Sequence, residues 1–180
     1  MFHRSERLFL RPGFPDDWRA ILAAVGDEAI VRNLARAPWP YGEADARGFA
    51  SLPQDAMAPH FLVTRPSARG EELVGSAGMG RDDDGRFELG YWIARPYWGR
   101  GYATEAGRAV IEVARMLGHR RLVAGHFTDN PASGRVLRKL GFRPTGVTAQ
   151  RHSAGRGGKA DCVEFEFDLS EGEVEMPKAA

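Results

Sequence analysis

The sequence contains a single cysteine, Cys162, and no long apolar stretch. One cysteine excludes an intrachain disulfide and a zinc site built from several cysteines. No uninterrupted apolar run approaches the roughly 20 residues that a membrane-spanning helix needs. Residues 1–10 are charged and alternating, unlike the apolar core of a signal peptide. We therefore expect a cytoplasmic protein that does not associate with a membrane.

An excess of charge of one sign is also missing. The chain has 25 lysine and arginine residues against 24 aspartate and glutamate residues, which gives a formal net charge of +1. Such a balance does not favour broad attraction to nucleic acid or to anionic lipid, so neither is expected as a partner. The Walker lysine and the G-x-G-x-x-G spacing of nucleotide-binding loops are absent as well.

Length and composition predict one domain. A chain of 180 residues with an apolar fraction of 43% is long enough for one well-packed core. We place a single domain at residues 1–170 and a polar tail at 171–180, for which disorder is an open alternative. Strands are predicted near 8–11, 60–64, 73–79 and 161–169, helices near 15–25, 28–35 and 43–52, and a mobile glycine-rich loop at 153–159.

The central segment carries the strongest local pattern. A strand-like run at residues 87–94 leads into a turn with Gly99 and Gly101, and a helical pattern follows from Ala103 to Leu117. A strand, a glycine turn and a helix N-terminus together offer several free backbone N–H groups to a phosphate. The segment therefore predicts a phosphate-binding loop, with an ordinary glycine-containing turn as the alternative.

A second strand and helix follow this loop. Residues 122–128 read as a strand, and Asn130 then stands where a helix N-cap belongs, with Pro131 at the first helical position. Gly141 ends the helix after a short apolar stripe, and Phe142 is expected to pack back onto that stripe.

The segments ELGYWIARPYWGRGYATEA and TDNPASGRVLRKLGF closely resemble the GNAT N-acetyltransferase superfamily, in its RimJ/RimL-like branch. In that family the loop before the long helix binds the pyrophosphate of acetyl-CoA, with the consensus Gln/Arg-x-x-Gly-x-Gly/Ala. Gly101 and Ala103 match this consensus, whereas Trp98 stands at the Gln/Arg position. The resemblance implies an α/β fold with a mixed, mostly antiparallel sheet flanked by helices, in which a splayed strand pair forms the acetyl-CoA cleft.

The resemblance also implies acetyl-CoA as co-substrate, without a metal. Asn130 would contact the pantetheine arm, and the hydroxyl of Ser133 would protonate the departing thiolate. Alternatively, Asn130 is only a helix cap and Ser133 is only a polar residue in the first turn of the helix. Arg138 would approach the 3′-phosphate, unless it is only a solvated surface residue. The residues expected to bind the cofactor are Trp92, Ile93, Ala94, Trp98, Gly99, Arg100, Gly101, Tyr102, Ala103, Thr104, Asn130, Ser133 and Arg138.

Glu88 is the candidate general base. A glutamate within so apolar a strand is unusual unless it lines a wet cleft, and the alternative is an ion pair with an arginine on a neighbouring strand. Deprotonating an α-amine at pH 7 costs about 1.4 kcal/mol, against roughly 4–5 kcal/mol for a lysine amine. One carboxylate, acting directly or through a water, is therefore sufficient for an α-amine.

The acceptor is expected to contact Trp39, Tyr41, Glu88 and His126, although Trp39 and Tyr41 equally suit a core-facing proline turn and His126 a buried site. We expect direct acetyl transfer to a primary amine, above all the N-terminal α-amine of a protein or peptide. A ping-pong reaction through Cys162 is disfavoured because no base lies near it in sequence. A small amine such as a polyamine, amino acid or antibiotic is the alternative acceptor. A non-catalytic CoA-binding protein is a further alternative, and a homodimer is left open.

Overall fold

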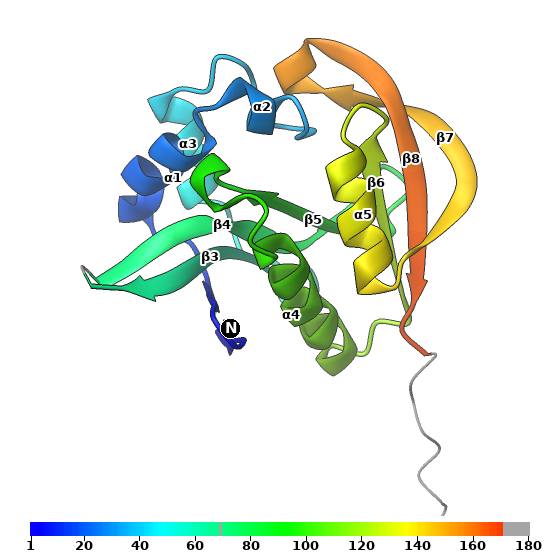
Figure 1. Ribbon diagram of the computed structural model, residues 1–180, viewed down its shortest axis with the longest axis horizontal. Helices are drawn as coiled ribbons and strands as arrows, with labels where there is room; N and C mark the ends of the chain where they lie inside the picture. The colour runs from blue at the N-terminus through cyan, green and yellow to red at the C-terminus, as the bar shows by residue number, and fades with distance from the viewer. Residues whose placement is uncertain (69, 171–180) are drawn as a thin grey trace, which may run out of the picture.

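The computed structural model describes residues 1–68 and 70–170, so the tail expected at 171–180 lies outside the described residues. Eight strands and five α-helices make up this part of the chain (Figure 1). The strands are β1 His3–Arg4, β2 Phe9–Arg11, β3 His60–Ser67, β4 Gly70–Arg81, β5 Phe87–Ile93, β6 Arg121–Phe127, β7 Arg143–Ser153 and β8 Gly158–Asp168. The helices are α1 Trp18–Val25, α2 Glu28–Val31, α3 Glu43–Ala50, α4 Tyr102–Met116 and α5 Pro131–Leu140, with single 3-10 turns at Pro15–Asp17, Arg95–Tyr97 and Ala154–Arg156.

The strands form one sheet in the order β1-β2-β3-β4-β5-β6-β8-β7. Neighbouring strands run antiparallel except β5 and β6, which are parallel and share a single register pair, Glu88 with Val123. The predicted mixed, mostly antiparallel sheet is confirmed. Because β5 and β6 diverge beyond Glu88, the C-terminal part of β5 has free main-chain groups on the side of β6.

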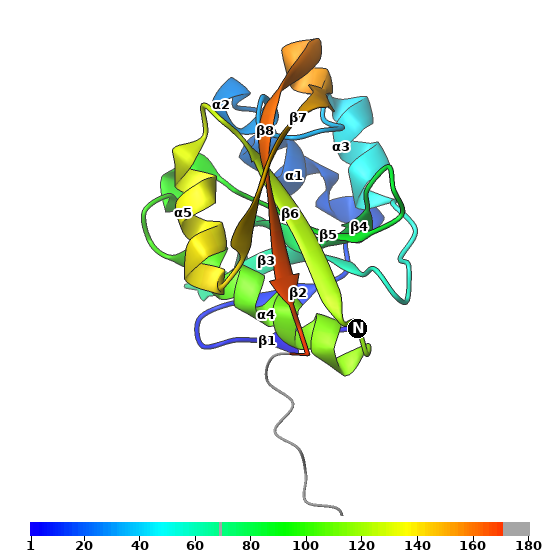
Figure 2. The same ribbon diagram turned by 90° about the vertical axis from the view of Figure 1, so that its right-hand side faces the viewer.

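Helices cover both faces of this sheet (Figures 1 and 2). Leu89 and Ile93 of β5 pack in one core cluster with α4 and α5, whereas Trp92 packs in a second cluster with α1 and α3. This division follows from the alternation of side chains along a strand. Each residue of β5 near the gap therefore faces either the cluster with α4 and α5 or the cluster with α1 and α3.

Helix α4 and helix α5 approach one another closely. Their contact passes over Gly107, where an added Cβ would lie 2.6 Å from Cδ1 of Leu140. Val110 of α4 and Leu137 of α5 are fully buried beside this contact, and burial of each side chain stabilises the fold by about 1.5–3 kcal/mol. The contact holds the two helices that flank the gap between β5 and β6.

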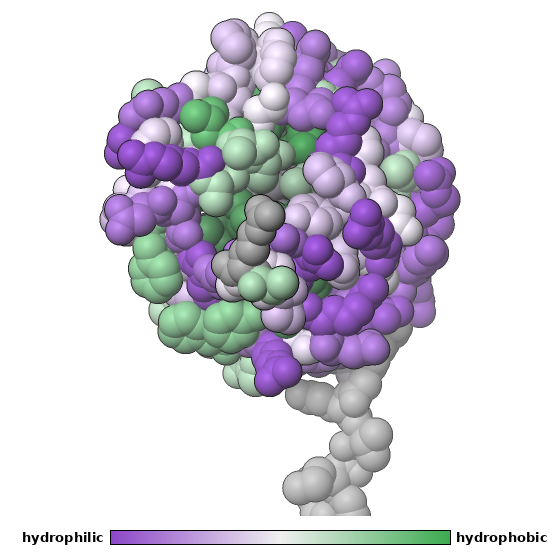
Figure 3. All heavy atoms as spheres, turned by 60° about the vertical axis from the view of Figure 1, so that its left-hand side comes forward, coloured by the Kyte–Doolittle hydropathy of each residue, from purple (hydrophilic) through white to green (hydrophobic). Residues whose placement is uncertain are grey.

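The outer surface is mainly hydrophilic on the face that Figure 3 shows. Hydrophilic residues, in purple, cover most of the face drawn in Figure 3, and hydrophobic ones gather in smaller areas. Across residues 1–68 and 70–170, no helix combines the length and the apolar character that crossing a bilayer requires.

Residues 143–159 differ from the sequence-based expectation. Within the expected mobile loop at 153–159, residues 154–157 form a tight turn between β7 and β8, and Ser153 at the end of β7 is fully buried. Strand β7 itself was not predicted. Its side chains are almost all exposed because it is the edge strand, so it lacks the apolar alternation that marks a half-buried strand.

The helix predicted near 28–35 is also shorter than expected, since α2 ends at Val31. The carbonyl groups of Arg32 and Leu34 accept hydrogen bonds from the hydroxyl of Ser153 at 3.3 and 2.8 Å. The side-chain amide of Asn33 donates to the carbonyl of Ala29 at 2.8 Å, while its backbone N–H donates to the carbonyl of Ile30 at 2.9 Å, so the bond that would continue the α-helix is not formed.

Candidate active site

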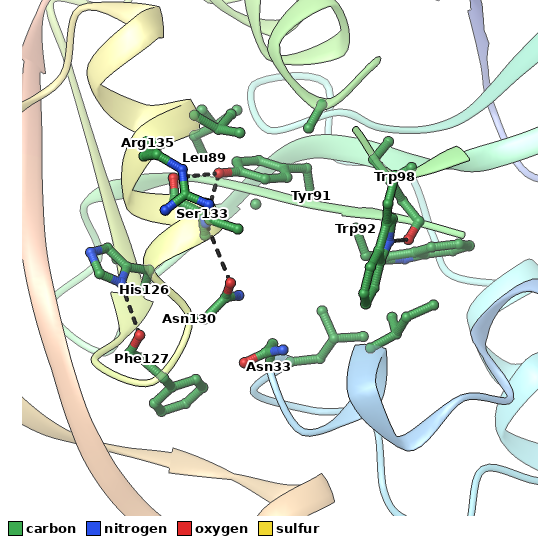
Figure 4. A pocket seen from close by; sticks show the side chains of 18 of the residues that line it. Asn33, Leu89, Tyr91, Trp92, Trp98, His126, Phe127, Asn130, Ser133 and Arg135 are labelled. Carbon is green, nitrogen blue, oxygen red and sulfur yellow. Dashed lines mark hydrogen bonds between the residues drawn. The ribbon is translucent and has the colours of Figure 1, made fainter. Parts of the chain in front are cut away.

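A cleft of about 520 Å³ opens where β5 and β6 diverge. Side chains from α2, β5, the β5–α4 loop, β6, α5 and β7 line it (Figure 4). Of the residues predicted from the sequence, the lining includes Glu88, Trp92, Ile93, Trp98, Gly99, Gly101, Tyr102, Ala103, Thr104, His126, Asn130 and Ser133. Segments distant in the chain therefore meet at the predicted place.

The glycine loop has the geometry of an anion-binding cradle. Gly99 and Gly101 have φ angles of 74° and 80°, which side chains other than glycine rarely adopt. Gly101 is the N-cap of α4, and no side chain caps the first turn of that helix. The first backbone N–H groups of α4 thus stay available, and they carry the positive end of the helix dipole. These features fit a bound pyrophosphate.

The N-terminal segment supports this loop through contacts that no local sequence pattern predicts. The guanidinium of Arg7 bonds to both the Glu105 carboxylate, at 2.7 Å from Nε, and the carbonyl of Arg100, at 3.2 Å. Ser5 donates its hydroxyl to the same carboxylate at 2.8 Å. Burial would raise the pKa of Glu105, but the bonds from the backbone N–H of Arg7, at 2.7 Å, from Ser5 and from the Arg7 guanidinium outweigh it and hold that pKa below its usual value. Arg7 therefore neutralises an acid beside the anion cradle.

Two predicted cofactor residues on either side of the loop do not line the cleft. Ala94 is buried in the cluster with α1 and α3, and Arg100 is exposed, with its guanidinium 5.8 Å from the ring centre of Tyr97. Trp98 does line the cleft, and its indole N–H donates to the carbonyl of Ile93 at 2.6 Å. The tryptophan at the Gln/Arg position thus bonds back to the end of β5.

The free edge of β5 can be assigned residue by residue. The N–H of Ala94 donates to the carbonyl of Val74 in β4 at 2.8 Å. Main-chain groups of an antiparallel pair alternate in direction, so Trp92 also points toward β4. The N–H groups of Tyr91 and Ile93 consequently face the gap toward β6.

Helix α5 places two predicted residues at the cleft. The side-chain oxygen of Asn130 accepts from the backbone N–H of Ser133 at 3.3 Å, which confirms the predicted N-cap. The hydroxyl of Ser133 lies 2.8 Å from the phenolic oxygen of Tyr91 (Figure 4). Burial raises the pKa of Tyr91 to about 12, although the bond to Ser133 opposes this shift. Tyr91 therefore stays protonated at physiological pH.

Glu88 is half-buried in the cleft and forms a close ion pair with Arg151 of β7. The second terminal nitrogen of Arg151 lies 3.5 Å from the Glu164 carboxylate. Burial raises the pKa of Glu88 despite the opposing attraction of Arg151. Glu88 thus lines the cleft and also forms the ion pair that was considered as the alternative. Its partner lies on β7, which was not predicted as a strand.

His126 faces the start of α5. Its Nδ1 lies 2.8 Å from the carbonyl oxygen of Phe127, and a carbonyl only accepts, so Nδ1 carries the proton. An added Cβ at Gly134 would lie 2.5 Å from Nε2 of His126, which explains a glycine at that helical position. The ring is therefore fixed against α5 within the lining of the cleft.

Three other predicted residues lie away from the cleft lining. Tyr41 packs against the cluster around α1 and α3, and burial raises its pKa to about 12. Trp39 is 41% exposed. The guanidinium of Arg138 lies 5.4 Å from the ring centre of Phe165, whereas its neighbours Arg135 and Lys139 line the cleft. Arg135 and Lys139, rather than Arg138, are thus the basic side chains of α5 that face the cleft.

Cys162 also lines the cleft but is poorly suited to nucleophilic attack. Burial raises the pKa of its thiol to about 11, and the nearby Arg151 only partly opposes this shift. A thiol must lose its proton to attack a thioester. The raised pKa therefore disfavours Cys162 as a nucleophile.

Comparisons with known proteins agree with this arrangement. Residues 7–143 match the acetyltransferase (GNAT) domain family. The chain is 31% identical over 152 residues to the uncharacterized N-acetyltransferase YoaA of Bacillus subtilis, covering 81% of this chain and 85% of that protein. It is 30% identical over 122 residues to the ribosomal-protein-serine acetyltransferase of Escherichia coli, covering 62% and 66% of the two chains.

The fold agrees as well. The crystal structure of a GNAT-family acetyltransferase from Bacillus anthracis superposes with a TM-score of 0.79 at 24% identity, and the match covers 94% of this chain and 99% of that one. The match over residues 7–143 spans the glycine loop, Glu88 and Ser133. The chain therefore belongs to the GNAT family of N-acetyltransferases, enzymes that use acetyl-CoA as the acetyl donor.

Proposed function

We propose that this enzyme transfers an acetyl group directly from acetyl-CoA to the N-terminal α-amine of a protein or peptide. The observation that carries the proposal is the gap between β5 and β6, which has an anion cradle at one end and the carboxylate of Glu88 on its wall. The similarity to a ribosomal-protein-serine acetyltransferase supports a protein acceptor. Residues 1–170 would form one domain, since one sheet joins both helix layers.

Different residues of the cleft bind different parts of acetyl-CoA in this proposal. Acetyl-CoA supplies a thioester whose carbonyl carbon the amine attacks. Backbone N–H groups at Gly101–Thr104 hold the pyrophosphate, with Arg135 and Lys139 available to the phosphates. The side-chain oxygen of Asn130 is already bonded to Ser133, so its amide nitrogen is the group that remains for the pantetheine arm. The N–H of Ile93 faces the gap and serves as the donor to the carbonyl oxygen.

Proton transfer is assigned to groups on opposite walls. Glu88, directly or through a water, takes the proton from the attacking amine as the C–N bond forms. Ser133 gives its proton to the sulfur as the C–S bond breaks. The phenolic oxygen of Tyr91 lies 2.8 Å from the Ser133 hydroxyl and 3.3 Å from the Ser133 carbonyl oxygen, so Tyr91 holds the serine in place beside the cleft. A mere CoA-binding protein would need none of these proton-transfer groups.

The test combines binding with transfer. Calorimetry with acetyl-CoA, with desulfo-CoA and ATP as comparators, should show micromolar binding of acetyl-CoA and none of ATP. Mass spectrometry of peptides incubated with enzyme and acetyl-CoA should then show acetylation at the α-amine and not at lysine. Failure to bind acetyl-CoA, or acetylation confined to lysine, would contradict the proposal.

A further inference from the structure

The two halves of the cleft lie on opposite faces of the sheet. Tyr91 and Ser133, assigned to the thioester, belong to the face that α4 and α5 cover. Glu88 shares its strand face with Trp92, which packs in the cluster with α1 and α3. The acceptor amine thus reaches Glu88 from this second face, beneath residues 27–36, which we name the roof. Figure 4 shows Asn33 of the roof across the cavity from Ser133.

The roof is fixed at both ends. At its start, Asp27 pairs with Arg95 at 3.0 Å and accepts from the N–H of Ala29 at 2.9 Å. At its end, the N–H of Ala154 donates to the carbonyl of Ala35 at 2.9 Å. The β7–β8 turn therefore closes over the far end of the roof.

Arg156 in that turn ties the roof to the loop after β6. Its Nε donates to the carbonyl of Arg32 at 2.6 Å, and its terminal nitrogens bond to the Asp129 carboxylate at 2.7 and 2.9 Å. An added Cβ at Gly155 would lie 2.7 Å from the carbonyl oxygen of Val31. Such close contacts preset the shape of the acceptor half before any acceptor binds.

The walls of this half are mainly apolar. Ile30 and Leu34 of the roof, Trp92 of β5 and Phe127 of β6 line it. The polar side chain of Asn33 is already engaged, because its amide nitrogen donates to the carbonyl of Ala29 at 2.8 Å and its oxygen accepts from Arg156 at 3.3 Å.

The cleft lining has little negative charge to pair with an acceptor that carries more than one ammonium group. Among the described residues that line the cleft, Glu88 is the only carboxylate, and Arg151 already pairs with it. Arg135 and Lys139 add positive charge toward the cofactor end. A second ammonium group on the acceptor would be desolvated without a free carboxylate to pair with it.

We propose that the acceptor is a primary amine with one positive charge and a neutral, apolar substituent, and that Ile30 and Leu34 of the roof select it. The inference rests on the proposed acetyl transfer and narrows its acceptor. It excludes polyamines and α-amines flanked by a lysine or arginine.

The first experiment compares matched acceptors with the full-length enzyme. Leucinamide and lysinamide each carry one α-amine and differ by the side-chain ammonium group, so lysinamide is the diamine of this pair. Peptides with Leu or Lys at the second position form the corresponding pair. We expect kcat/KM to be about tenfold or more higher for the singly charged member of each pair, which corresponds to about 1.4 kcal/mol. Equal or faster acetylation of the diamine would overturn the inference while leaving the proposed transfer intact.

A matched pair of variants tests the roof itself. Leu34→Glu adds a carboxylate to the apolar wall, and Leu34→Gln changes the shape in the same way without charge. Leu34→Glu should shift the kcat/KM ratio several-fold toward the diamine, and Leu34→Gln should not. An identical ratio in both variants would refute selection by the roof. Acetyl-CoA binding without transfer to any amine would overturn the proposed function, and the inference with it.

Discussion

At the scale of single residues, Glu88 is subject to two opposing influences. Burial favours its neutral form, and the adjacent Arg151 favours the carboxylate. Burial prevails, so the pKa of Glu88 lies above the ordinary value of 4.5. A base with a raised pKa takes a proton from an amine more readily near neutral pH than an ordinary carboxylate does.

Glu88→Gln should therefore lower kcat by about 10²–10⁴-fold, the usual contribution of a general base. Because only the ionised carboxylate accepts a proton, the wild-type rate should rise as pH passes upward through the pKa of Glu88, and the variant should lose this rise. Initial rates across pH, with acetyl-CoA affinity measured in parallel as a control, check both points. An unchanged pH–rate profile would remove Glu88 from the role.

Arg151→Gln gives the complementary test. Arg151 lowers the pKa of Glu88, so its removal should raise that pKa further and shift the rising limb of the profile to higher pH. Because this variant keeps the Glu88 carboxylate as the base, its maximum rate at high pH should fall less than that of Glu88→Gln. A limb that stays in place would show that the ion pair does not tune the base.

Ser133 and Tyr91 should separate in their effects. Ser133→Ala removes the assigned general acid and should slow kcat by about 10²-fold or more. Tyr91→Phe removes the bonds of the phenol to the hydroxyl and the carbonyl of Ser133, each worth about 0.5–1.5 kcal/mol, and should slow kcat by a few-fold to about tenfold. Acetyl-CoA affinity from calorimetry should stay near wild type in both. Wild-type turnover in Ser133→Ala would make the serine merely structural.

At the scale of elements, the β7–β8 turn acts on the acceptor half through the roof. Arg156 bonds to the roof and to Asp129. Arg156→Gln removes four hydrogen bonds of this guanidinium. It should therefore raise the KM for the amine by about 3–10-fold, since only part of the free energy of these bonds bears on amine binding. The dissociation constant of acetyl-CoA should not change.

The exposed Arg108 on α4 supplies the matched control, since Arg108→Gln removes the same charge far from the roof. Steady-state kinetics with both substrates varied distinguish the two variants. A rise in the KM for acetyl-CoA in Arg156→Gln would contradict the assignment of this turn to the acceptor half.

The glycine loop shows how an element depends on segments outside it. Its cradle comes from consecutive residues, Gly99 to Thr104, whose conformation glycine permits. Its electrostatic support comes from Arg7, which neutralises Glu105 in the first turn of α4. An unpaired carboxylate there would repel the pyrophosphate of the cofactor.

At the scale of the whole molecule, acid should destabilise the fold. The pKa values of Asp17, Glu105 and Asp129 are lowered in the folded state, chiefly by bonds to arginine that outweigh any burial. Folded-state pKa values below the unfolded ones contribute stability above about pH 4–5, and this stability is lost as pH falls through the folded values. Glu88 has the opposite sign, since its raised pKa contributes stability that is lost as pH rises.

Thermal unfolding followed by circular dichroism should therefore give a lower Tm at pH 3.5 than at pH 7. Asp17 pairs with the buried Arg11 at 2.8 Å, so Asp17→Asn should lower the Tm at pH 7 and reduce its fall toward acid. An equal fall in Tm in the variant and the wild type would show that this pair does not carry the acid sensitivity.

What the sequence by itself determined are the features made by neighbouring residues. Gly99 and Gly101 set the loop before α4, Asn130 caps α5, and the alternation of β5 assigns Glu88 and Tyr91 to opposite faces. Each of these follows from local sterics and hydrogen bonding within a few residues. The family resemblance was carried by the same segments.

Only the tertiary structure decided the partners of these residues. Glu88 pairs with Arg151 63 positions away, Tyr91 meets Ser133 42 positions away, and Arg7 reaches Glu105 across 98 positions. The roof likewise depends on a turn near residue 155. No local pattern specifies such contacts, because they arise from the order of strands in the sheet and from packing of side chains that the chain brings together only when it folds.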